Sequence, residues 1–142
     1  MNNLELFNLA AGAILGGLVD SLPMPSDINP NRLAATIAPD DFTIEQHVIF
    51  VGLVEHAGHW LKDEGYIRQS KQAYHSLAGP ALQGVVLTEK ALAVLGQIPD
   101  ALQQQTSLGE TLRKGVAEGS RTLIADAFKY VVTAGAALVA GT

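Results

Sequence analysis

The chain contains no cysteine among its 142 residues. This absence excludes disulfide bonds, thiolate chemistry and cysteine-based zinc sites. A length of 142 residues fits a single domain, residues 1–142, and is sufficient to bury a core without covalent cross-links.

Charged side chains are also scarce. Asp, Glu, Lys and Arg make up 16% of the sequence, below the usual proportion of about a quarter, whereas apolar residues make up 48%. Much of the surface is therefore short of charge, which favours cover by a second chain. The formal net charge is -5, so the overall field does not attract nucleic acid, and only a local basic patch would do so.

The N-terminal run MNNLELFNLAAGAILGGLV lacks the cationic region with which a secretory signal begins. Glu5 lies where lysine is expected, and the first basic residue is Arg32. We interpret the run as a helix of the mature protein and expect a cytoplasmic location.

Residues 3–20 place apolar side chains at spacings of three and four, which predicts a helix. Its other side is not strongly polar, so burial on most sides is expected, and Gly12 and Gly16 would permit close approach of another backbone. The segment SLPMPSD, with two prolines, predicts the end of this helix. Asn29 as an N-cap before Pro30 predicts a short second helix, to about Ile37.

Thr43 and Gln46 match a capping box, which predicts a third helix to about Glu64, stopped by Gly65. The apolar run Val48 to Val51 predicts burial on several sides. The expected inward face comprises Ile44, Phe50, Leu53, Val54, Ala57, Trp60 and Leu61. The expected exposed residues are Glu45, Gln46, His47, Glu55, His56, His59, Lys62 and Asp63.

Two strand-like runs follow, one starting at Tyr66-Ile67 and one over Val85 to Leu87, with Gly79-Pro80 as a turn between them. Thr88 is the expected cap of a helix ending near Pro99. The predicted fold class is mainly α with a small β-hairpin.

Ser107 and Glu110 match another capping box, which opens a final helical segment over residues 107–140. Its apolar residues recur over more than thirty positions, which is long for a globular helix. We therefore expect a break near Gly115 or Gly119.

The order of these elements, together with the stretches LKDEGYIR and VVLTEKALAVL, resembles winged-helix regulators of the MarR and PadR type over residues 4–98. The resemblance implies a winged-helix-like domain followed by long C-terminal helical structure, and a homodimer built by the end helices. The residues that it assigns to dimerisation are Leu4, Phe7, Gly12, Gly16, Leu123, Phe128, Val131 and Leu138.

The helix before the wing departs from the pattern of a base-reading helix. Residues 44–64 carry four acidic residues against one basic residue, Lys62. In the wing, by contrast, residues 65–88 carry no acidic residue, and Arg68, Lys71 and His75 are the candidates for phosphate contact. The alternative interpretation is a solvated hairpin with two ordinary cations, which would release few counterions.

No enzyme signature is present: there is no G-x-S-x-G, no HExxH and no phosphate-binding glycine loop after a strand. His56 and His59 share a helix face near Glu55 and Asp63, a pattern that is conceivable for a metal site but more typical of exposed histidines. We therefore expect no metal, no cofactor and no catalytic residue.

The final stretch YVVTAGAALVAGT has no charge but is shorter than the roughly 20 residues of a membrane span. Its upstream polar face mixes both signs of charge, which weakens a membrane-surface interpretation.

Three functional hypotheses follow. The first is a non-enzymatic interaction or adaptor module that works as a homo-oligomer with a protein partner. The second is a dimeric DNA-binding regulator that uses Arg68 and Lys71, although the net charge disfavours DNA. The third is a membrane-associating protein acting through its C-terminal apolar helix.

Overall fold

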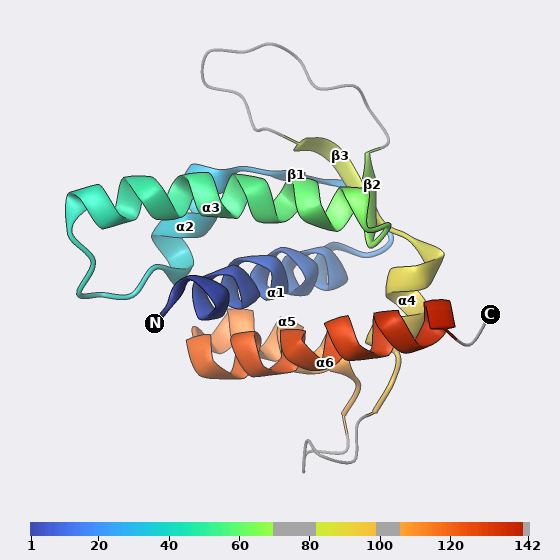
Figure 1. Cartoon of the computed structure of the whole chain (residues 1–142). Helices are drawn as coiled ribbons and strands as arrows, with labels where there is room; N and C mark the ends of the chain where they lie inside the picture. Colours follow the sequence, from blue (N-terminus) through green and yellow to red (C-terminus); the bar gives the residue numbers. More distant parts are fainter. Residues whose placement is uncertain (70–81, 99–105, 141–142) are drawn as a thin grey trace.

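The computed structural model describes residues 1–69, 82–98 and 106–140, and it is mainly α-helical with a small antiparallel sheet (Figure 1). The fold class predicted from the sequence is confirmed at this level. The described helices are α1 Asn3–Ser21, α2 Pro30–Ile37, α3 Ile44–Asp63, α4 Glu89–Leu95, α5 Leu108–Glu118 and α6 Arg121–Ala140. The described strands are β1 Ser26–Ile28, β2 Ile67–Gln69 and β3 Leu82–Leu87.

The sheet has one strand more than the predicted hairpin. Its order is β1-β3-β2, with both neighbours antiparallel to β3. The sequence did not predict β1, because two prolines directly before it form a pattern typical of a loop. The Asp27 carboxylate accepts a hydrogen bond from the Gly84 N–H at 2.9 Å, where the register between β1 and β3 is irregular.

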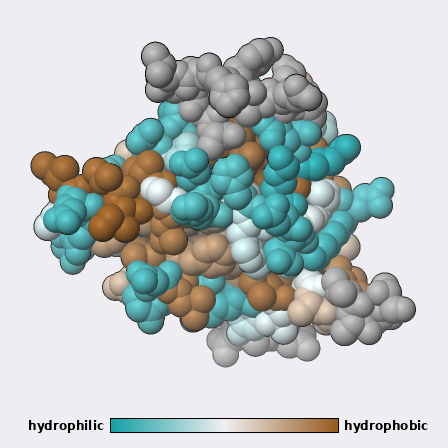
Figure 2. All heavy atoms as spheres, turned by 45° about the horizontal axis from the view of Figure 1, so that its top comes forward, coloured by the Kyte–Doolittle hydropathy of each residue, from teal (hydrophilic) through white to brown (hydrophobic). Residues whose placement is uncertain are grey.

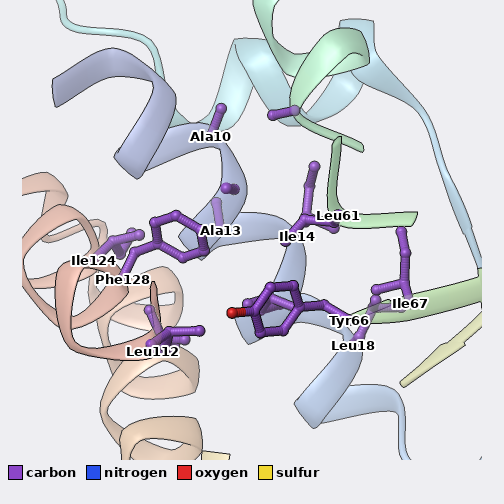
Figure 3. Packing of buried hydrophobic residues seen from close by; sticks show 14 of the residues in the cluster. Ala10, Ala13, Ile14, Leu18, Leu61, Tyr66, Ile67, Leu112, Ile124 and Phe128 are labelled. Carbon is purple, nitrogen blue, oxygen red and sulfur yellow. The ribbon is translucent and has the colours of Figure 1, made fainter. Parts of the chain in front are cut away.

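Helix α1 lies at the centre, with α3 on one side and α5 and α6 on the other (Figure 1). Every residue from Asn8 to Gly16 is buried, as expected for a helix that is apolar nearly all round. Figure 3 shows Leu112, Ile124 and Phe128 gathered beside it. The core therefore forms around α1.

The two glycines of α1 permit close packing inside the chain. Ile124 and Leu112 fill the space where a Cβ of Gly12 would stand, and Leu112 and Val116 fill that space at Gly16. The close approach that the sequence predicts at these glycines is therefore made by α5 and α6 of the same chain.

An aromatic cluster joins α1, α3 and α6. The Phe7 ring meets the Trp60 ring edge-on at 5.3 Å and the Phe128 ring at 6.1 Å. Trp60 in turn stacks on Tyr66 at 6.0 Å. Burial, with a smaller contribution from the negative charge of Glu64, raises the pKa of Tyr66, so this phenol stays neutral in the fold.

The expected break in the last helical segment occurs at Gly119. Its φ of +68° is the left-handed conformation that ends α5, and α6 starts at Arg121. The Arg121 side chain donates to the carbonyl oxygens of Ile37 and Ala38 at 2.9 and 2.8 Å, at the end of α2.

Two details of the helix ends differ from the prediction. Helix α4 ends at Leu95 rather than near Pro99. The Ser107 hydroxyl accepts from the Glu110 N–H, but the Glu110 carboxylate pairs with Arg113 instead of completing a capping box. This hydrogen bond from Arg113 lowers the pKa of Glu110.

Candidate interaction face on helix α3

Helix α3 is stabilised by a capping box at its N-terminus and anchored to the core by one stripe of buried residues. Thr43 and Gln46 form the capping box that the sequence predicts. The helix buries Phe50, Val54, Ala57, Gly58 and Leu61. Val51, Leu53 and Trp60 flank this stripe and are partly buried against the core.

The first turns of α3 expose three large apolar side chains. Ile44 is 87% exposed, Val48 65% and Ile49 67%. Figure 1 shows this end of α3 extending past α1, and Figure 2 shows apolar surface gathered at the same end of the molecule beside hydrophilic residues. Exposed contiguous apolar surface of this kind is typical of an interaction site.

Two expectations were wrong here. Ile44 was placed on the inward face, and the Val48–Val51 run was expected to be buried on several sides, yet Val48 and Ile49 are exposed. At about 100° per residue, Ile44 lies roughly a quarter-turn from the direction of Leu61. The spacing of Phe50, Val54, Ala57 and Leu61 already carries the signal, since it describes a complete buried stripe without these residues.

Gly52 lies one turn after Val48 on the same outward side. A Cβ built at this position meets no atom within 4 Å. The helix surface is therefore flat at Gly52, with the exposed side chains of Val48 and His56 one turn before and after it.

Acidic side chains lie beside this apolar surface and further along α3. Glu45, Glu55 and Asp63 are exposed on α3, as predicted. Lys62 is the one Lys or Arg residue of the helix, and its ammonium group donates to the Gln69 side chain at 3.2 Å. The outer face of α3 therefore combines an apolar N-terminal end with a negative rim formed by Glu45 and Glu55.

The histidines of α3 do not form a metal site with their neighbours. His56 and His59 are exposed, as expected. Within residues 1–69, 82–98 and 106–140, no three His, Cys, Asp or Glu side chains come together as metal ligands.

The wing candidates are only partly described. Arg68 is exposed on β2, opposite Val86 of β3. Lys71 and His75 lie outside the described residues. Nearby, the Lys90 ammonium donates to the Glu64 carbonyl at 2.8 Å and lies 4.4 Å from the centre of the Tyr66 ring. The ammonium group of Lys90 therefore already has contacts within the chain.

The residues assigned to dimerisation fall into two groups. Leu4 is 66% exposed and Leu138 37% exposed, so both are accessible to another chain. The remaining ones pack largely inside this chain: Phe7 and Leu123 are partly buried, and Gly12, Gly16, Phe128 and Val131 are buried.

A cleft of about 470 Å³ lies between α1, β1, α2 and α5. Its walls are mainly apolar, and Arg32, Asp27 and Gly17 also border it. One Asp27 oxygen is already engaged by the Gly84 N–H.

Of the helices in the described residues, α1 has the length and hydropathy of a membrane span. More than half of that window is buried in the protein, which is equally typical of a core helix. Helix α6 also turns apolar residues inward, with Ile124, Ala127, Phe128 and Val131 buried.

Comparison of the chain with protein-family models, with curated proteins and with solved structures finds no match. The outer face of α3 is therefore the feature of the molecule that bears most directly on function.

Proposed function

We propose that the protein is a non-enzymatic interaction module, built on a winged-helix-like scaffold, that binds a protein partner through the outer face of α3. The observation that carries the proposal is the exposure of Ile44, Val48 and Ile49 on one end of a well-anchored helix. Exposing three large apolar side chains together is unfavourable in water, and a bound partner would remove this cost.

The order α1, β1, α2, α3, β2, β3 supports the scaffold part of the proposal, because it is the order that the winged-helix resemblance implies, with β1 added. In that arrangement the helix before the wing is the one that contacts a target. Here its outer face is apolar and acidic, which suits a protein surface better than a phosphate backbone.

The proposal is tested by photo-crosslinking in the cells that naturally produce the protein. A photoreactive amino acid replaces Ile49 in one variant and Leu92, which is 47% exposed on α4, in a matched control. We expect a discrete cross-linked protein from position 49 and none from position 92. Cross-linking that is absent at position 49, or equal at both positions, would contradict the proposal.

A DNA-binding regulator is the second candidate, favoured by the exposure of Arg68 on β2, the edge strand that belongs to the expected wing. A titration of mixed-sequence duplex DNA at low and moderate salt separates the two functions. Under the interaction proposal, no binding is expected even at low salt. Binding that weakens steeply with salt and is lost in Arg68→Glu and Lys71→Glu variants would favour the regulator.

A further inference from the structure

Within the described part of the chain, Gly52 makes no contact that requires glycine. A Cβ there would stand in open space, and its φ lies outside the left-handed region. Glycine destabilises a helix interior relative to alanine. At Gly12 and Gly135, by contrast, neighbouring atoms occupy the position of a Cβ. Among the described helical glycines, Gly17 beside the cleft shares the open surroundings of Gly52.

A glycine on an outer helix face allows a second backbone to approach closely from outside. Successive turns of α3 place Val48 before Gly52 and His56 after it, while Ile49 lies along one side. Val48 and Ile49 offer apolar contacts beside Gly52, where the helix surface has no side chain. Two helices that cross at a short distance need a surface of this kind at the crossing point.

The charges around this surface select the partner. Glu45 and Glu55 lie beside it and Asp63 lies further along α3, while the single cation of α3, Lys62, is held by Gln69. A second copy of this chain would bring the same carboxylates and a net charge of -5 against them. Opposed like charges are unfavourable, whereas lysine or arginine on the partner would complement the rim.

We infer that the outer face of α3 receives a helix of a different protein, apolar on its contact side and rich in Lys and Arg along its flanks, which crosses α3 at Gly52. This inference rests on the proposed function and specifies its partner class.

The first experiment titrates the full chain with two labelled amphipathic helical peptides, followed by fluorescence anisotropy. One peptide combines leucines with lysines, and the other has every lysine replaced by glutamate. We expect saturable binding of the lysine peptide at least about tenfold tighter than that of the glutamate peptide. This preference should shrink as salt is raised from about 50 mM to about 300 mM, because surface charges are then screened.

Three variants locate the binding. Gly52→Leu fills the crossing point, and Val48→Ser with Ile49→Ser removes the apolar contact. Each should weaken the lysine peptide by about tenfold or more. Leu92→Ser, a matched exposed leucine on α4, should leave the affinity unchanged. Circular dichroism of each variant should show unchanged helix content.

The outcomes separate the inference from the proposed function. Equal binding of both peptides, or lysine-peptide binding that none of the α3 variants weakens, overturns the partner class. Dimerisation seen by light scattering at about pH 8, where the chain is negatively charged, and abolished by Ile49→Ser also overturns it, while α3 remains a docking face.

The class of partner is tested in cells by repeating the cross-linking experiment with the photoreactive residue at position 52. Mass spectrometry of the cross-linked segment should identify a basic sequence with apolar residues at helical spacing in a different protein. A segment of this same chain, or one of net negative charge, overturns the inference. No cross-link from either position 49 or position 52 contradicts the proposed function as well.

Discussion

At the residue scale, two helical glycines have opposite surroundings. Gly135 is buried in α6, and a methyl group there would overlap the hydroxyl oxygen of Tyr66. Tyr66 cannot easily yield, since its ring is stacked on Trp60 and covered by Lys90. Gly52 faces open space on α3. The same substitution should therefore have opposite effects at the two positions.

Gly135→Ala should destabilise the protein by about 1–3 kcal/mol, the usual cost of overpacking a core. Gly52→Ala should stabilise it by about 0.5–1 kcal/mol, because alanine restricts the unfolded chain and fits the helix. Chemical denaturation measures both free energies of unfolding. Adding Tyr66→Phe should recover part of the loss at Gly135, and equal stability of wild type and Gly135→Ala would contradict the packing described here.

At the element scale, one side chain joins the start of α6 to the loop before α3. The Arg121 guanidinium donates to the Ile37 and Ala38 carbonyl oxygens and lies 3.3 Å from an Asp40 carboxylate oxygen. The hydrogen bonds from Arg121 to the two carbonyl oxygens are partly buried, whereas the Asp40 side chain is almost fully exposed. The backbone contacts should therefore dominate the effect of Arg121 on stability.

Arg121→Ala should lower the free energy of unfolding by about 1–3 kcal/mol, because it leaves carbonyl groups at the end of α2 without their charged donor. Asp40→Ala is the matched control, since it removes the ion pair alone, and it should change stability little. Thermal denaturation of both variants measures the difference. A larger loss from Asp40→Ala than from Arg121→Ala would show that the ion pair is the dominant contact.

At the scale of the whole molecule, net charge and exposed apolar surface oppose each other. The chain carries a formal charge of -5 at pH 7 and has a sequence pI of about 5.2. Its most exposed large apolar side chain, within the described residues, is Ile44 of α3. Repulsion between copies is therefore present at neutral pH and is lost near the pI.

Lowering the pH from about 8 to about 5.5 should promote self-association through the apolar end of α3. Light scattering measures the apparent mass at each pH. The double variant Val48→Ser, Ile49→Ser should associate less than wild type at the lower pH, whereas Leu92→Ser should behave like wild type. Association that is unaffected by the α3 double variant would assign it to another surface, such as that of Leu4 and Leu138.

The sequence by itself determined the local elements, because their signals lie within a few residues of one another. Caps at Asn29 and Thr43 start α2 and α3, and Gly65 and Gly119 stop helices through backbone conformations that favour glycine. The apolar periodicity of residues 3–20 likewise predicts the burial of α1, and the lack of cysteine excludes disulfide bonds.

Only the tertiary structure decided which apolar residues remain outside the core. Val48 and Ile49 belong to the same apolar run as Phe50, and only the packing of α3 against α1 and α2 selects Phe50 for burial. Likewise, β1 forms because β3 supplies its hydrogen-bond partners from more than fifty residues away. Such long-range partners leave no local pattern. On α3, the spacing of Phe50, Val54 and Leu61 indicates one buried stripe, but only the fold decides that no described element covers Val48 and Ile49.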